Sequence, residues 1–302
     1  MSVAIPPDAD IPDILDAPGS RTGGFVRAVM STTEGRVGVV VTVLMLALVL
    51  IGPLVAPHPP NQLDPGAVLE GPSGGHVLGT DQLGRDVFSR FLWGGRTVIV
   101  VPFIAVTIAC AVGALLGISA AYIGGAYDIL VSRLFDFALT MPTLLIALVL
   151  IWALGTDAAV LVAVVALVFV PRLGRVFRGA AQGVVTQDYL AAAQARGERL
   201  GYILLRELLP NMIAMVIANY ALFMTYAIIF VATLSFLGLG AQPPSSDWGL
   251  MVSQSFGFAT TNPWATLAPS FGIAGLSLAF ILLGDAVTRH LTNDVEASAV
   301  PL

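Results

Sequence analysis

The 302-residue sequence contains no lysine, so all 14 of its basic residues are arginine. A phosphate-cradling loop of the pattern Gly-x-x-x-x-Gly-Lys-Ser/Thr needs a lysine, and its absence excludes such an ATP site from this chain. Cysteine is almost as scarce. The single Cys110 excludes an intramolecular disulfide and any metal site built on paired cysteines. We therefore expect the chain to bind no cofactor and no metal ion of its own.

Charge is also scarce. Charged residues make up 11% of the sequence and hydrophobic residues 57%, with a mean hydropathy of +0.88. So little polar surface cannot cover a soluble globule, which indicates an integral membrane protein. The alternation of apolar and polar residues that marks outer-membrane barrel strands is absent, so the backbone must form its hydrogen bonds within helices. We predict an all-α integral membrane fold.

Six apolar segments approach the length of roughly 20 residues that a helix needs to cross about 30 Å of hydrocarbon. The predicted spans are 37–56, 97–121, 134–154, 157–173, 212–236 and 267–287. The fourth is the shortest of the set. The predicted architecture is therefore six transmembrane helices.

The arginines are distributed unevenly over the connections between these spans. If the amino terminus is cytoplasmic, 11 of the 14 face the cytoplasm, and only Arg85, Arg90 and Arg96 lie outside. This asymmetry predicts that both termini are cytoplasmic, because positive charge accumulates in cytoplasmic loops. The net charge of −5 comes partly from acidic residues near the amino terminus, so it indicates no nucleic-acid partner.

Proline and acidic residues among the first 36 positions predict a disordered tail, since this composition buries too little apolar surface to fold alone. The predicted organisation is a disordered cytoplasmic tail at 1–36, a first transmembrane helix at 37–56, an extracytoplasmic segment at 57–96, a five-helix core at 97–287 containing a cytoplasmic loop at 174–211, and a cytoplasmic tail at 288–302.

A polar, arginine-rich stretch at 188–211 lies between two long apolar segments. Residues 191–196 are strong helix formers, Gly197 suits a helix end with positive φ, and Pro210 limits a second short helix. The stretch resembles the loop by which permease subunits of ABC importers dock onto their ATPases. That family pattern is Glu-Ala-Ala, three residues, Gly, nine residues, then Ile-x-Leu-Pro. The residues in register with it are Ala192, Ala193, Gly197, Leu209 and Pro210.

Two positions depart from the pattern, with Ala191 in place of Glu and Glu207 in place of Ile. The resemblance implies that the five matching residues form the ATPase-coupling contact and that Arg196, Glu198 or Arg199 pairs with the partner. Loss of the family's Glu leads to the hypothesis that coupling is asymmetric beside a second permease with a fuller motif. The alternative is an ordinary cytoplasmic loop between two spans.

Further motifs, in order over about residues 76 to 290, resemble the C type of permease in the dipeptide, oligopeptide and nickel transport family. They lie at 76–96, 124–142, 235–251, 263–269 and 284–286. Within the first, Asp81 is predicted to cap the helix that follows, and Arg85 and Asp86 are predicted to pair locally with Arg90. A structural element at the membrane surface is favoured there over a substrate contact.

Arg133 and Asp136 lie three residues apart on one predicted helix face, which predicts an ion pair between them. A second interpretation places Asp136 on the translocation path. Pro142 is a candidate hinge beside that path, because proline removes a helix hydrogen bond. Trp248 and Trp264 are expected in the interfacial belt, where amphipathic rings lie among lipid headgroups.

These resemblances imply a type I ABC importer permease in the bacterial cytoplasmic membrane. The implied partners are a second homologous permease, two cytoplasmic ATPase subunits that carry the ATP and Mg²⁺, an extracytoplasmic substrate-binding protein and membrane lipid. The chain itself is implied to be no enzyme and to have no catalytic residue. Di- or oligopeptides are the favoured substrates, and nickel complexes or other small solutes are the alternative.

Two other classes of membrane protein fit the sequence less well. An intramembrane hydrolase would use Ser277 as nucleophile, but His58, His76 and His290 lie outside the predicted spans or at their edges, so a base is lacking. A stand-alone carrier or channel would use ionisable groups at mid-membrane, and such groups are almost absent from the spans. A gradient-driven carrier would also transport without nucleotide.

Overall fold

The computed structural model describes residues 33–299, with side chains from 35 to 287. The predicted tail at 1–36 therefore lies largely outside the described residues, and its described part belongs to a helix that begins at Thr33. The predicted tail at 288–302 is described only as helical backbone up to Ala299. Over the described residues the chain forms helices and no strand, so the all-α prediction is confirmed.

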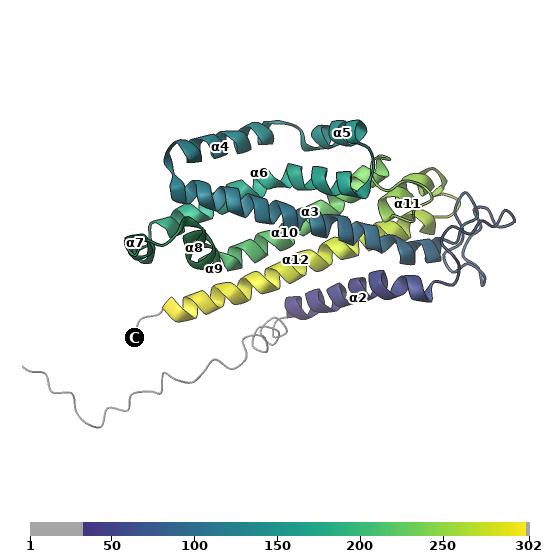
Figure 1. Ribbon diagram of the computed structural model, residues 1–302. Coiled ribbons are helices and arrows are strands. Elements are labelled where there is room, and N and C mark those ends of the chain that lie inside the picture. Colours follow the sequence, from purple (N-terminus) through teal and green to yellow (C-terminus); the bar gives the residue numbers. More distant parts are fainter. Residues whose placement is uncertain (1–32, 300–302) are drawn as a thin grey trace, which may run out of the picture.

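Long helices lie side by side and form the body of the molecule (Figure 1). Five of them are long and apolar enough to cross a membrane. They are α2 (Thr33–Val55), α3 (Val87–Ile123), α6 (Ala158–Val185), α10 (Ile213–Phe236) and α12 (Trp264–Ala299). The shortest predicted span, 157–173, is the first part of α6, which continues through Pro171 into the predicted cytoplasmic loop.

The predicted span 134–154 is not one helix. It is divided between α4 (Gly125–Thr140) and α5 (Thr143–Leu154), whose axes meet at 87°. The break falls at Met141, which is extended (φ −84°, ψ 137°) and precedes Pro142. Proline disfavours the helical conformation of the residue before it, which explains the position of the break. The described residues thus contain five single candidate spans, or six if the bent pair counts as one.

The centre of the bundle is the packing of α3 against α6. Gly113 and Gly117 of α3 face Gly174 of α6 so closely that a Cβ at Gly117 would press on the Gly174 carbonyl oxygen. Leu173 and Phe177 of α6 are fully buried beside this crossing. Small residues let the two helix backbones approach closely, which is how helices associate in membranes without a hydrophobic driving force.

The two ends of the bundle differ. One end carries α7 (Asp188–Ala195), α8 (Leu200–Tyr202), the π-helix η1 (Ile203–Leu208) and α9 (Leu209–Asn211), as Figure 1 shows. The opposite end carries α11 (Trp248–Ser255), the short 3₁₀ turn η2 (Phe256–Phe258) and the loop that follows α2.

The expected interfacial position of Trp248 is wrong. Its side chain is fully buried, stacks on Phe91 with ring centroids 5.3 Å apart, and donates from Nε1 to the Phe91 carbonyl oxygen at 2.8 Å. Glycines on α3 and α12 leave the space that its ring occupies, including Gly95 and Gly272. Trp248 therefore anchors α11 to the bundle, whereas Trp264 is 41% exposed and has the accessibility that the lipid belt requires.

Candidate functional site

Residues 188–211, here called the α7–α9 element, form a compact protrusion at one end of the bundle (Figure 1). Helix α7 ends in a Schellman motif. Gly197 has φ +74°, its N–H donates to the Gln194 carbonyl at 2.9 Å, and the N–H of Glu198 donates to the Ala193 carbonyl at 3.3 Å. Glycine adopts this left-handed conformation without a Cβ penalty. Gly197 therefore sets the sharp reversal between α7 and α8.

The matched alanines of α7 have different environments. Ala193 is fully buried together with Leu190, and Leu190 belongs to the core that contains Leu208 of η1. Ala192 is exposed. The helix thus uses one face to hold the α7–α9 element on the bundle, and leaves the small side chains of Ala191 and Ala192 exposed.

The far end of the element contains an unusual helical turn. Residues 203–208 form a π-helix, in which the N–H of Leu209 donates to the Leu204 carbonyl. Pro210 lies in α9, which directly continues η1. Leu209 is half-buried against the core and Pro210 is exposed. Leu209 therefore braces the element against the core, and Pro210 is exposed for contact with another protein.

Arg196 connects the two arms of the element. Its guanidinium lies 3.7 Å from the Glu198 carboxylate and 3.5 Å from that of Glu207. Glu207 also acts on Tyr189, because burial and the nearby carboxylate together raise the pKa of that phenol. The residue that departs from the family pattern thus has a place inside the element, which sequence spacing did not indicate.

The predicted ion pair between Arg133 and Asp136 is wrong. Asp136 lies 3.1 Å from Arg175 of α6, and both side chains are about half exposed or more. A second pair joins the same two helices, with Arg178 Nη2 donating to Asp128 Oδ2 at 2.6 Å. These partners come from different helices, so sequence spacing within one helix could not identify them. Pro142 lies at the bend between α4 and α5, as described above.

The different burial of these two ion pairs predicts that they contribute differently to the stability of the fold. Asp128→Ala is expected to lower the free energy of unfolding by about 1.5–3 kcal/mol, because it leaves the partly buried Arg178 without its charged partner. Asp136→Ala is expected to cost about 0–1 kcal/mol, since exposed pairs contribute little. Thermal unfolding of both purified variants measures the difference. Equal losses would contradict the prediction, and lost transport in a stable Asp136→Ala variant would favour its place on the translocation path.

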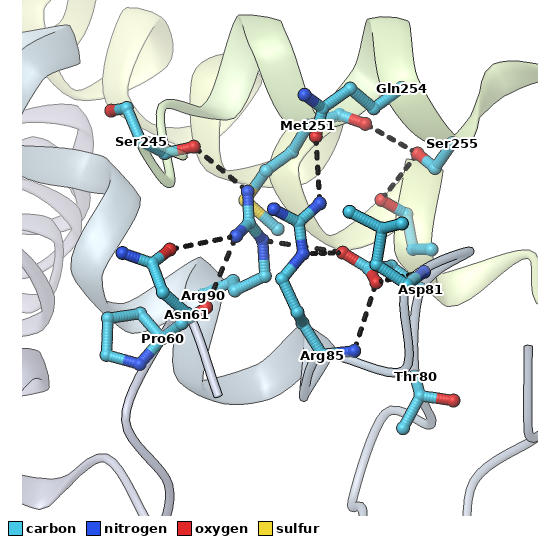
Figure 2. A network of polar contacts seen from close by, with 12 residues as sticks. Pro60, Asn61, Thr80, Asp81, Arg85, Arg90, Ser245, Met251, Gln254 and Ser255 are labelled. Atoms are coloured by element: carbon cyan, nitrogen blue, oxygen red, sulfur yellow. Dashed lines mark hydrogen bonds and ion pairs between the residues drawn. The ribbon is translucent and has the colours of Figure 1, made fainter. Parts of the chain in front are cut away.

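At the opposite end, a buried polar network surrounds Asp81 (Figure 2). Asp81 Oδ1 accepts from the backbone N–H groups of Leu83 and Arg85, and Oδ2 accepts from Arg85 Nε at 2.7 Å. Asp81 therefore closes its own turn and does not cap α3. The cap is Asp86, which directly precedes the helix and accepts from the Ser89 N–H at 2.7 Å.

Arg90 connects separate parts of the chain through this network. Its Nη1 donates to the Pro60 carbonyl at 3.2 Å, its Nη2 donates to the Ser245 carbonyl at 2.9 Å, and its Nε lies 3.7 Å from Asp81 (Figure 2). Arg85 extends the network to Gln254 of α11 at 3.1 Å. The predicted local pairing of Arg90 with Asp86 is therefore wrong, and these arginines hold the loop after α2, α3 and α11 together.

Ser277 lies on α12, where it is buried and its carbonyl oxygen accepts from Thr225 at 3.3 Å. It borders a groove of about 440 Å³ between α10, α11 and α12, whose lining is mostly apolar. His58 and His76 lie instead beside Asp86 at the start of α3. Among the side chains that the structure describes, no histidine therefore lies beside Ser277 to act as its base.

Comparisons with known proteins identify relatives of this chain. Residues 113–296 match the family described as binding-protein-dependent transport system inner membrane component. The dipeptide transport system permease protein DppC of Alkalihalophilus pseudofirmus is 36% identical over 84% of each chain. DppC of Haemophilus influenzae is 33% identical over 84% of this chain and 88% of its own. The probable D,D-dipeptide transport system permease protein DdpC of Escherichia coli is 35% identical over 82% and 83%.

Proposed function

Because the chain belongs to the family of binding-protein-dependent transport system inner membrane components, we propose that it is the permease subunit of an ATP-driven importer of di- or oligopeptides. The observation that carries the substrate class is the similarity, over more than four-fifths of each chain, to permeases named for dipeptide transport. Nickel complexes are the alternative within the same family. The chain is a multi-pass protein of the inner membrane.

The proposed assembly contains this chain, a second homologous permease, two cytoplasmic ATPase subunits and an extracytoplasmic binding protein. ATP and Mg²⁺ belong to the ATPases, since the chain has no lysine for a phosphate-binding loop. The arginine distribution supports cytoplasmic termini. With that orientation the α7–α9 element faces the ATPases, and the network around Asp81 lies outside, where the binding protein delivers its substrate.

The geometry supports a specific route for the coupling. The exposed face of α7, with Ala192, allows an ATPase surface to approach closely, because its side chains are small. The buried face, with Leu190 and Ala193, transmits a push on α7 into the bundle core. A rigid-body shift of packed helices between two discrete arrangements would then open or close the path. We propose that Gly197 and Pro210 fix the two turns that keep this element rigid.

Peptide uptake by the reconstituted complex tests the proposal. Proteoliposomes that hold the complex with ATP in the lumen are expected to accumulate a labelled dipeptide only when the binding protein is present outside. A complex whose ATPases bind but cannot hydrolyse ATP serves as the control and is expected to show no uptake. Accumulation without nucleotide would instead indicate a gradient-driven carrier, and accumulation of Ni²⁺ but not peptide would indicate the nickel alternative.

A further inference from the structure

Two histidines and a carboxylate come together at the start of α3. His76 Nδ1 lies 3.0 Å from Asp86 Oδ1, and His58 Nδ1 lies 3.8 Å from Asp86 Oδ2. The two imidazole rings have centroids 5.1 Å apart. One possible ligand atom from each side chain lies within 4.8 Å of the others. Among the described residues, these three form the one group of at least three His, Cys, Asp or Glu side chains that could hold a metal ion.

The backbone holds each of the three residues in place. The N–H of His58 donates to Ser89 Oγ at 3.1 Å, which fixes the chain after α2 against α3. The His76 carbonyl accepts from the N–H of Ser73 at 2.8 Å and from that of Gly79 at 2.9 Å. Asp86 is the N-cap of α3 and its side chain is almost fully buried. The ligand atoms are therefore positioned before anything binds.

One atom of the cluster lacks the partner that burial requires. His58 Nδ1 is buried and makes no hydrogen bond, although it points toward Asp86 at a distance too long for one. A buried ring nitrogen without a partner costs free energy. The carboxylate of Asp86 retains acceptor capacity beyond its bonds to Ser89 and His76, because an ionised carboxylate offers about four lone-pair positions. The cluster thus contains a ring nitrogen without a hydrogen-bond partner, and the Asp86 carboxylate faces this nitrogen.

We propose that His58, His76 and Asp86 form an extracytoplasmic binding site for a divalent first-row transition metal ion, with Zn²⁺ as the best-fitting member of that class. Two imidazoles and one carboxylate are a zinc ligand set that leaves a fourth position for water or another donor. Imidazole ligands disfavour Mg²⁺ and Ca²⁺, which select oxygen. This differs from the expectation, drawn from the sequence, that the chain binds no metal.

The distances allow the ion with small movements. Ligand atoms at about 2.1 Å from a tetrahedral metal are roughly 3.4 Å apart, and the three present atoms lie 3.0 to 4.8 Å apart. Shifts of about 1 Å or less in the two rings close the set. The ion would join the chain after α2, the following loop and α3 at one point, because each of these segments contributes one ligand. The site would therefore stabilise the extracytoplasmic loop beside the Arg90 network.

Metal binding by the full-length chain, purified through a tag without histidine and stripped with a chelator, tests the proposal. Calorimetry is expected to show about one Zn²⁺ per chain and a raised melting temperature. His58→Gln and His76→Gln are each expected to weaken binding by more than the roughly 10- to 100-fold loss typical of outer-shell changes. His290→Gln is the matched control, since it removes the chain's third histidine, and it is expected to bind as the unchanged chain does.

Three results would overturn the site. They are no saturable Zn²⁺ binding, undiminished binding by both glutamine variants, or displacement of Zn²⁺ by an equal concentration of Mg²⁺. Visible absorption of Co²⁺ bound to the unchanged chain is a measurement that depends on no variant, and absence of any nitrogen-ligated Co²⁺ band would also overturn it. Binding is measured without transport, so a failure here leaves the proposed peptide import untouched.

Discussion

Arg90→Met is expected to lower the free energy of unfolding by about 3–5 kcal/mol, the cost of removing one partner from a buried charged network. The guanidinium is 1% exposed, and its loss leaves the carbonyl oxygens of Pro60 and Ser245 without their donor. Asp81 keeps Arg85 but loses its second positive neighbour. The methionine side chain fills similar space, so the effect reports on the polar contacts and not on a cavity.

Thermal unfolding in detergent measures this loss, which corresponds to a decrease of about 5–8 °C in the melting temperature for a chain of this size. Arg96→Met is the matched control, because Arg96 lies on the same helix but is exposed, with its guanidinium 5.9 Å from the Trp93 ring. It is expected to change stability by at most about 1 kcal/mol. Equal effects of the two substitutions would show that the network contributes nothing beyond surface charge.

Arg90→Lys refines the same prediction. Lysine keeps the charge but lacks the planar fork that reaches Pro60, Ser245 and Asp81 in separate directions. An intermediate loss is expected. Full stability of the lysine variant would mean that charge alone, and not the geometry of the hydrogen bonds, holds the loop and α11 to α3.

The roles that could be predicted correctly from the sequence are those that depend on residues close by in the chain. The apolar length of α3 or α10 predicts a membrane span, and Gly197 followed a run of helix formers, so the helix end could be predicted. The bend at Pro142 is local too, although its size of 87° was not expected for a segment apolar enough to cross as one helix.

The residues whose roles were missed have partners on other elements. Asp136 pairs with Arg175 on α6, Trp248 is buried against α3, and Glu207 reaches back to Arg196. Nothing in the spacing of one segment reports how two helices pack, so these contacts required the structure. The cluster of His58, His76 and Asp86 belongs to the same group, because its members come from separate parts of the segment between α2 and α3 and only the folded loop brings them together.

Gly197→Val is expected to reduce ATP-driven peptide uptake about tenfold or more while the bundle stays folded. A β-branched residue held at φ +74° costs about 1–2 kcal/mol, so the reversal after α7 will relax toward negative φ and displace α8. A loss of 1.4 kcal/mol in the productive docked geometry corresponds to a tenfold change. The space around Gly197 is open, so no steric clash with the core complicates the result.

Gly155→Val is a closely matched control for this prediction. Gly155 also has positive φ (+103°), also ends a helix and also has open space around its Cα, but it lies in the turn between α5 and α6. Gly155 (φ +103°, ψ 173°) occupies a region that essentially only glycine adopts, so its variant carries at least as much backbone strain and its melting temperature should fall at least as far. If Gly197 acts in coupling, only its variant loses uptake and ATPase co-purification. Equal losses of uptake at both glycines would show that strain alone is responsible and would remove the α7–α9 element from the proposed coupling contact.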